Sequence, residues 1–214
     1  IHCGLVGSEM CIRDRIYFTL CDVSGKGVNA GMVMARAITL FKIYSKNNFK
    51  PNEIHFEMNN DLQQTNPKGV YVTSIVGSYN LTTDIVELSN AGHLPALFKN
   101  GKEFLEYNSS SLPLGVKKAD SSKEYRLESF KLEDGRLYCF TDGFSECRNE
   151  NDEEIGIEGV KQLILNYQNT SLKKELSKII KDVEIKSIKD QNFDQDKSNE
   201  SILEDDLTII GLGK

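Results

Sequence analysis

The sequence lacks several features that would each indicate a particular class of protein. No apolar stretch approaches the roughly 18 residues that a membrane-spanning helix needs, and no signal peptide is visible. None of the five cysteines forms a C-x-x-C pair, and an odd, scattered set argues against a disulfide framework or a zinc site. The formal net charge of −6 disfavours a nucleic-acid partner. We therefore expect a cytoplasmic domain that binds neither nucleic acid nor a membrane.

Two motifs of phosphate chemistry are incomplete. Cysteine-dependent phosphatases need a His-Cys pair with an arginine six residues after the cysteine, but Glu9 stands at that position after Cys3. A phosphate-binding loop of the form G-x-x-x-x-G-K-[ST] fails at both ends, because Leu20 occupies the first glycine position and Gly27 the last position. A cysteine phosphatase and a nucleotide-dependent switch are therefore both disfavoured.

The length and composition of the sequence are those of a single globular domain. Its 214 residues, 39% of them hydrophobic and 27% charged, are ordinary for a soluble globular chain. Residues 1–15 show neither helical nor strand periodicity and resemble a translated sequencing-adapter read-through. We therefore expect a non-native segment at 1–15, followed at 16–214 by a single domain that has lost its natural N-terminal part.

Hydrophobic periodicity predicts helices at the two ends of this domain and closely spaced strands between them. Helices are expected from about residue 28, at 51–64, at 157–167 and at 172–189. Strands are expected at 16–22, 70–79, 85–90, 94–99, 102–107, 125–132, 136–141 and 207–212. Turn residues predict three hairpins, 70–79 with 85–90, 94–99 with 102–107, and 125–132 with 136–141. This order predicts an α+β layered fold in which helices cover the sheets.

Aspartates stand directly beside three of the predicted strands, at Asp22, Asp142, and the pair Asp205 and Asp206. Each one alone is compatible with a turn or a strand start. Together, two carboxylates about 4 Å apart would repel by roughly 4 kcal/mol at an effective dielectric near 20, so a cluster requires positive charge. Because all the candidate ligands are hard oxygen donors, Mg²⁺ or Mn²⁺ is favoured over zinc or copper. Calcium is an alternative, although the spacing of an EF-hand loop is missing.

Five stretches of the chain resemble, in the same order, the successive motifs of the SpoIIE/RsbU branch of the type 2C serine/threonine protein phosphatases. They are 21–35 (CDVSGKGVNAGMVMA), 72–98 (VTSIVGSYNLTTDIVELSNAGHLPALF), 111–116 (SLPLGV), 140–156 (FTDGFSECRNENDEEIG) and 204–210 (EDDLTII). One such motif would be weak, whereas five in order are specific. The resemblance implies an α-β-β-α sandwich of two antiparallel sheets flanked by helices.

The resemblance also implies a centre of two divalent cations, Mn²⁺ or Mg²⁺. By motif, Asp22 would bridge both cations, and the backbone carbonyl of Val23 would be a further ligand. Asp142 and Asp205 would complete the shell of the second cation. Asp206 would contact the metal ligands rather than the cations, or would begin the strand. The alternative is that Asp205 and Asp206 exchange roles. Water activated between the cations would then hydrolyse a phosphoserine or phosphothreonine ester.

Three further residues are candidates for a role in such a site. His93, in NAGHLP, could position the substrate or protonate the leaving group, and a structural histidine that bonds a loop carbonyl is the equal alternative. Lys26, with Gly25 before it, could attract the phosphorylated substrate, whereas a solvated lysine beside a helix start is the alternative. All three lie within the motif stretches.

The sequence departs from the family at one position. The family begins this domain with a Gly-Gly-Asp segment that supplies another bridging aspartate, and here Asp14 is the only nearby aspartate. This departure keeps a second function open, that of an inactive protein-binding module. For the active enzyme, the resemblance implies a STAS-type regulator, such as an anti-anti-sigma factor, as substrate and a sensor domain that precedes the catalytic domain.

Overall fold

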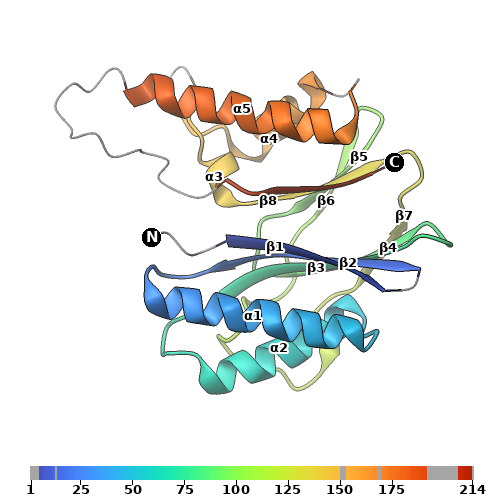
Figure 1. The fold of residues 1–214 in the computed structure, drawn as a ribbon, viewed down its shortest axis with the longest axis vertical. Coiled ribbons are helices and arrows are strands. Elements are labelled where there is room, and N and C mark those ends of the chain that lie inside the picture. The colour runs from blue at the N-terminus through green and yellow to red at the C-terminus, as the bar shows by residue number, and fades with distance from the viewer. Residues whose placement is uncertain (1–4, 13, 150–152, 168–169, 192–206, 214) are drawn as a thin grey trace.

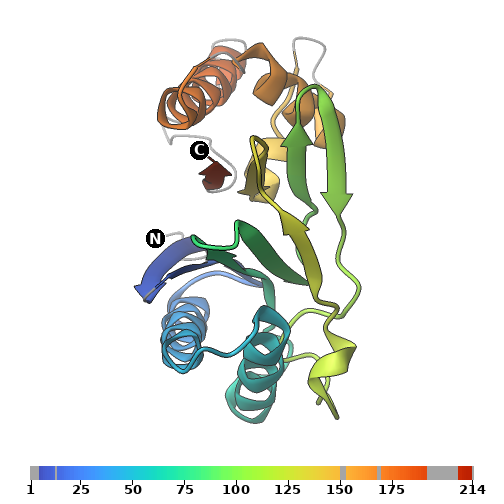
Figure 2. The same cartoon turned by 90° about the vertical axis from the view of Figure 1, so that its right-hand side faces the viewer.

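Two antiparallel sheets stack face to face, and helices cover both outer faces (Figure 1, Figure 2). This computed structural model describes residues 5–12, 14–149, 153–167, 170–191 and 207–213. The first sheet has the order β1-β2-β3-β4-β7, with β1 (Leu5–Ile12), β2 (Arg15–Val23), β3 (Val72–Asn80), β4 (Ile85–Ala91) and β7 (Glu128–Lys131). The second has the order β6-β5-β8-β9, with β5 (Ala96–Asn100), β6 (Glu103–Tyr107), β8 (Arg136–Phe140) and β9 (Ile209–Gly213). The predicted fold class, an α-β-β-α sandwich, is confirmed.

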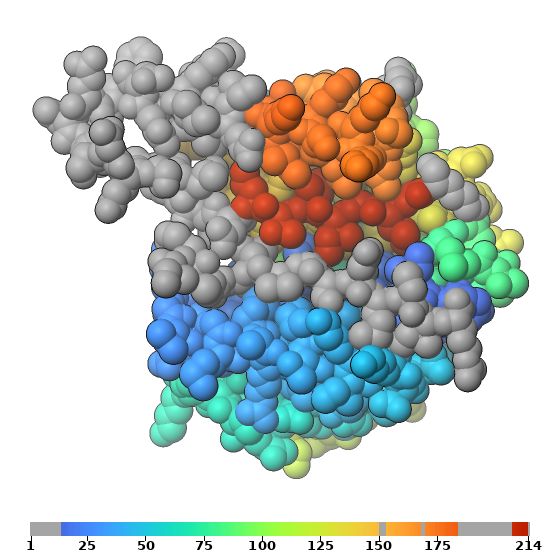
Figure 3. Space-filling view, in the orientation of Figure 1, coloured from blue at the N-terminus to red at the C-terminus, as the bar shows by residue number. Residues whose placement is uncertain are grey.

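The helices lie in two pairs. Helices α1 (Val28–Lys46) and α2 (Pro51–Thr65) cover the first sheet, and α4 (Gly156–Asn166) and α5 (Leu172–Gln191) cover the second (Figure 2). A single turn, α3 (Asp142–Ser145), follows β8, and a 3₁₀ turn, η1 (Ser122–Glu124), precedes β7. In the space-filling view, β9 (red) lies between the surfaces of α5 (orange) and α1 (blue) (Figure 3). Within the described ranges, no helix has the length and apolar composition needed to cross a bilayer.

Three apolar layers hold these elements together. One lies between α1, α2 and the first sheet, one between the two sheets, and one between the second sheet and α4 and α5. Strand β2 contributes to two of them because its side chains alternate between the faces of the sheet. Tyr17, Cys21 and Val23 face the helices, whereas Phe18 and Leu20 face the other sheet. This alternation decides which face any polar residue of β2 occupies.

The third predicted hairpin is wrong. Residues 128–131 pair with β4 in the first sheet, whereas residues 136–140 pair with β5 and β9 in the second. The turn between them crosses from one sheet to the other. Asp84 fixes the start of this turn by two hydrogen bonds. The carbonyl of Asp84 accepts from the Leu132 amide at 3.0 Å, and its carboxylate accepts from the Glu133 amide at 3.0 Å. The other two predicted hairpins are confirmed.

Residues 5–12, within the segment predicted to be non-native, are part of the first sheet although they show no strand periodicity. These residues form β1, which pairs with β2 from Leu5 opposite Asp22 to Ile12 opposite Arg15. An edge strand is held by backbone hydrogen bonds, so it needs no alternating side chains, and it covers the open edge of β2. The origin of the segment and the domain boundary at residue 16 stay predictions.

A buried polar network lies under α2, away from the inter-sheet space. His55 of α2 is fully buried, with Nδ1 2.9 Å from the hydroxyl of Ser89 and Nε2 3.1 Å from the hydroxyl of Ser74. The Ser74 hydroxyl also lies 3.4 Å from the sulfur of Cys21. Burial lowers the pKa of His55 from 6.5 to about 3, so the ring is neutral in the folded protein at neutral pH.

This network predicts a loss of stability in mild acid. The folded state keeps His55 neutral down to about pH 3, whereas the unfolded chain protonates it below about pH 6.5. The unfolded state therefore binds one more proton between these values, and the free energy of unfolding falls by about 1.4 kcal/mol per pH unit as the pH decreases. Urea unfolding at several pH values should show a shallower slope for His55→Gln. Equal slopes for both proteins would show that His55 does not carry the effect.

Candidate metal-dependent active site

Asp22 lies on the inter-sheet face of the first sheet, one residue before the end of β2. It continues the row of Phe18 and Leu20, which is buried between the sheets. The register places Asp22 directly opposite Thr73 of β3, so the two side chains share a face, with Cα atoms about 5 Å apart. An apolar row that ends in a half-buried carboxylate suits a site that holds a cation.

His93 connects the two sheets beside Asp22 and Thr73. It follows β4 and is 9% exposed. Its Nδ1 lies 2.8 Å from the hydroxyl of Thr73, and its Nε2 lies 3.2 Å from the carbonyl oxygen of Phe140, the last residue of β8. Because a carbonyl can only accept, the ring proton is on Nε2, and Nδ1 accepts the hydroxyl proton of Thr73.

The surroundings of His93 keep its ring neutral. Burial lowers the pKa to about 4, against a smaller opposing effect of the Phe140 carbonyl. With a hydrogen bond at each nitrogen and no charge at neutral pH, the ring is better suited to fixing the two sheets than to donating a proton. The contacts therefore favour the structural alternative for His93.

The turn that holds His93 depends on Gly92. Its φ is +69°, in the left-handed region, and an added Cβ would lie 2.5 Å from the ring of Pro113. The amide of Gly92 donates to the hydroxyl of Ser109 at 2.6 Å, and the amide of His93 donates to the side chain of Asn90 at 3.0 Å. The position of the ring is thus set by the local contact with Asn90 and by the more distant residues Ser109 and Pro113.

Asp142 begins α3 at the end of β8, two residues after Phe140. Its neighbour Thr141 is fully buried and pairs with Thr208: the Thr141 amide donates to the Thr208 carbonyl, and the Thr208 amide donates to the Thr141 hydroxyl, both at 3.1 Å. The chain that leads into β9 therefore lies beside Asp142. Asp205 and Asp206, which come just before, are outside the described residues.

Val23 is the last residue of β2, and Gly25 and Lys26 lie in the turn between β2 and α1. The Ser24 amide donates to the Tyr71 carbonyl, so alternation along the strand directs the carbonyl of Val23 away from β3. Gly25 has a φ of +97°, a backbone conformation that glycine adopts without strain. Lys26 is exposed on the same turn. The position of Val23 is compatible with its predicted role as a backbone ligand.

Asp14 lies far from this site, at the opposite end of β2. Its carboxylate accepts from the side-chain amide of Asn80 at 2.9 Å, and its carbonyl accepts from the amide of Leu81 at 2.7 Å. Eight positions of extended chain separate Asp14 from Asp22, about 26 Å. Asp14 therefore cannot supply the additional bridging carboxylate.

Two of the described carboxylates are of the kind that a hard divalent cation binds. Asp22 and Asp142 offer carboxylate oxygens at the ends of strands from the two sheets, and both ends lie toward the same side of the sandwich (Figure 1). The sulfur of Cys21 faces α1 and α2, on the opposite face of β2. Among the residues that the structure describes, no group of three or more His, Cys, Asp or Glu residues could hold a metal ion. The ligand set therefore stays a prediction.

Sequence reasoning missed three threonines of this region. Thr73, Thr141 and Thr208 make the contacts that join β3, β8 and the chain before β9. Two of them had a local signal, because Thr141 precedes Asp142 and Thr208 follows Asp206 by two positions. Thr73 had none, because only the pairing register places it opposite Asp22.

Comparison with known proteins supports this architecture. Residues 13–213 match the family described as Stage II sporulation protein E (SpoIIE). The SiaA-PP2C domain of Pseudomonas aeruginosa superposes with a TM-score of 0.79 at 15% sequence identity, covering 100% of this chain and 80% of that chain. RsbX in complex with magnesium superposes with a TM-score of 0.68 at 16% identity, covering 98% of this chain and 86% of that chain.

A longer relative contains the same fold as one part. The RsbU and RsbW domains of Rv1364c from Mycobacterium tuberculosis superpose with a TM-score of 0.74 at 19% identity, covering 97% of this chain. This chain spans 54% of that structure's length. A search of curated protein sequences finds no match. At these identities the solved structures establish the fold, and the match over residues 13–213 establishes the family.

Proposed function

Because the chain belongs to the SpoIIE family, whose structural neighbours include PP2C phosphatase domains, we propose that it is a metal-dependent serine/threonine protein phosphatase. It hydrolyses phosphoserine or phosphothreonine on a regulatory protein. The observation that carries this proposal is the placement of Asp22 and Asp142 at strand ends of opposite sheets, with His93 in contact with both sheets between them.

The residues that hold two divalent cations in this proposal are Asp22, Asp142 and Asp205, with the carbonyl of Val23. Asp206 is the alternative to Asp205, and the Thr141–Thr208 contact brings the chain just after them to the end of β8. Mn²⁺ or Mg²⁺ suits oxygen donors of this kind, and one structural neighbour is described in complex with magnesium. When bound, such cations activate water and neutralise the phosphoryl oxygens.

The protein's own part in the reaction is to position the carboxylates. His93 keeps its proton on Nε2, bonded to Phe140, and accepts from Thr73, so it fixes the spacing of the two sheets on either side of Asp22 and Asp142. Gly25 shapes the turn that presents Lys26, whose ammonium attracts the phosphorylated substrate. In phosphoryl transfer, positioning and electrostatics supply most of the rate.

The proposed substrate is a STAS-type regulator, such as an anti-anti-sigma factor, under the control of a sensor domain that precedes this domain. The support is the family, together with the fold shared with an RsbU domain. The proposed reaction takes place in the cytoplasm. Removal of the phosphate changes which protein the regulator binds.

The test is manganese-dependent release of phosphate from a phosphoserine peptide. The register places Leu5, which has no carboxylate, opposite Asp22. We expect weak activity from this chain, and a clear increase when residues 3–5 are replaced by Gly-Gly-Asp, because an aspartate then faces Asp22 across β1 and β2. A chelator should abolish the activity of both proteins. No activity from the replaced chain at saturating Mn²⁺, with the fold intact, would contradict the proposal.

A second function, that of an inactive protein-binding module, is favoured by one observation. Asp14 lies about 26 Å along β2 from Asp22 and already binds Asn80, so it does not complete a bridging set. If the Gly-Gly-Asp variant releases no phosphate and still binds a phosphorylated regulator, this second function replaces the first.

A further inference from the structure

Three segments that are far apart in sequence converge at the end of the first sheet where Asp22 lies. They are 23–35, 65–74 and 107–119. Ser24 and Tyr71 exchange two hydrogen bonds of 2.9 Å, from the Ser24 amide to the Tyr71 carbonyl and from the Tyr71 amide to the Ser24 hydroxyl. Val72 and Leu114 exchange backbone hydrogen bonds of 2.9 and 2.7 Å. The three segments therefore form one continuous surface, which begins one residue after Asp22.

The charge of this surface differs from that of the rest of the chain. The whole protein has 32 acidic residues against 26 lysines and arginines, yet the three segments contain no aspartate or glutamate. They contain four lysines, all exposed: Lys26, Lys68, Lys117 and Lys118. A local positive charge of this kind attracts acidic partners and steers their approach.

The same surface carries exposed apolar side chains. Of the eight large hydrophobic side chains that are exposed in the described ranges, five belong to these segments: Val28, Met32, Tyr71, Leu112 and Val116. Val28 is 80% exposed and Met32 is 68% exposed, and they lie one helical turn apart on α1. Leu112 and Val116 flank Leu114, which binds Val72 next to Tyr71. A gathering of apolar side chains rimmed by charge is typical of a protein interaction site.

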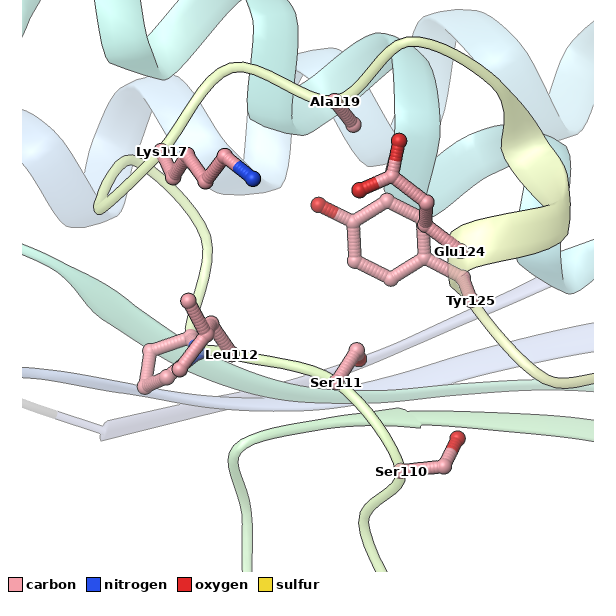
Figure 4. A pocket seen from close by; sticks show the side chains of 8 residues that line it. Ser110, Ser111, Leu112, Lys117, Ala119, Glu124 and Tyr125 are labelled. Atoms are coloured by element: carbon pink, nitrogen blue, oxygen red, sulfur yellow. The ribbon is translucent and has the colours of Figure 1, made fainter.

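A pocket of about 270 Å³ lies at one edge of this surface (Figure 4). Leu112 and Lys117 line it on one side, and Tyr125 and Glu124 on the other. The hydroxyl of Tyr125 points into the pocket toward Lys117 (Figure 4), although the residue itself is only 5% exposed. The Glu124 carboxylate accepts from the amide of Asp120 at 2.6 Å. The pocket can therefore receive a side chain of a partner that covers Leu112.

We propose that these three segments form a docking surface for an acidic segment of the phosphoprotein substrate that also carries apolar side chains. The docking surface consists of the four lysines and the five exposed apolar residues. This proposal rests on the proposed function and specifies which kind of substrate segment the protein binds. The lysines bind carboxylates that flank the phosphorylated residue, the apolar residues bind its hydrophobic neighbours, and the phosphate then lies beside Asp22.

The test measures binding rather than turnover, so it applies to an inactive chain as well. Two labelled phosphoserine peptides of equal length are compared by fluorescence anisotropy, one with Asp, Glu and Leu around the phosphoserine and one with Lys and Ser. We expect the acidic, apolar peptide to bind at least about tenfold more tightly, with an affinity that falls as salt rises. The variant Lys117→Glu/Lys118→Glu should remove this preference. Leu112→Ser should weaken binding by about fivefold or more.

Matched variants elsewhere on the chain control for charge and hydrophobicity. Lys42→Glu/Lys131→Glu reverses two exposed lysines outside the three segments, and Leu105→Ser removes an exposed leucine on β6. Both controls should bind the acidic peptide as the unchanged chain does. Equal affinity for the two peptides, or equal effects of the control and test variants, would overturn the docking surface.

The remaining outcomes separate this proposal from its alternatives. Hydrolysis of p-nitrophenyl phosphate, which is too small to reach the docking surface, should be unaffected by Lys117→Glu/Lys118→Glu in the Gly-Gly-Asp variant. If that small substrate is not hydrolysed but the peptide preference holds, the proposed enzyme fails and the docking surface stands. If sedimentation instead shows a dimer that Leu112→Ser dissociates, a second copy of the chain occupies the surface and the proposal is wrong.

Discussion

Asp22→Asn is expected to reduce manganese-dependent phosphate release by more than about 100-fold. Loss of a residue that only supports a metal ligand already costs about 10–100-fold, so loss of a direct, bridging ligand should cost more. The comparison is made in the chain that carries Gly-Gly-Asp at positions 3–5. A second readout is thermal unfolding with and without Mn²⁺. The cation should stabilise the unchanged protein, by about 2.7 kcal/mol at 100 times its dissociation constant, and should not stabilise the variant.

The control for Asp22→Asn is Asp134→Asn, which changes an exposed aspartate in the turn between β7 and β8. It removes the same charge far from the proposed ligands and should leave both readouts unchanged. Full activity of Asp22→Asn would exclude the site described above, whatever the family.

Glu175→Ala is expected to lower the free energy of unfolding by about 3–5 kcal/mol. Glu175 of α5 is fully buried, where it pairs with Arg136 and accepts from the hydroxyl of Tyr138 at 2.7 Å. Burial lowers the pKa of Lys99, which lies directly opposite Arg136 on β5, and the Glu175 carboxylate opposes this effect. Removing the carboxylate therefore leaves two buried or half-buried cations beside each other and an unpaired phenol. Urea unfolding measures the loss.

Two further variants decide whether the pairing of Glu175 carries this effect. Glu158→Ala removes an exposed carboxylate that pairs with Lys161 and should cost less than about 1 kcal/mol. Glu175→Leu combined with Arg136→Met replaces the ion pair by apolar side chains of similar size, and should recover at least half of the stability lost in Glu175→Ala. If the double variant is less stable than Glu175→Ala, the cost arises from packing rather than from the unpaired charge.

The layered fold could be predicted because its signals are local. Pro51 begins α2, the Asn100-Gly101 turn joins β5 and β6, and alternation along β2 separates the two faces of the first sheet. The third hairpin could not be predicted, because a turn signal says nothing about which sheet each strand joins. That choice depends on Asp84, which binds the Glu133 amide 49 positions away.

The aspartates of the candidate site could be proposed from the sequence, whereas the contacts that hold the surrounding strands together could not. An aspartate at a strand end is visible in the sequence, since a carboxylate beside an apolar run is unusual. The contacts of His93 with Thr73 and Phe140 depend on how two sheets stack, and no spacing along the chain encodes that distance. Strand β1 was missed for a related reason, because an edge strand follows the backbone of its neighbour rather than its own side chains.

The pairing of β8 with β9 has a consequence for how the protein is made. Thr141 and Thr208 are 67 positions apart, so a growing chain releases β8 from the ribosome well before its outer partner exists. Until β9 is synthesised, the edge of β8 that faces β9 in the folded protein lacks that partner strand. Slow translation after α4 would prolong this exposure and favour aggregation or chaperone binding.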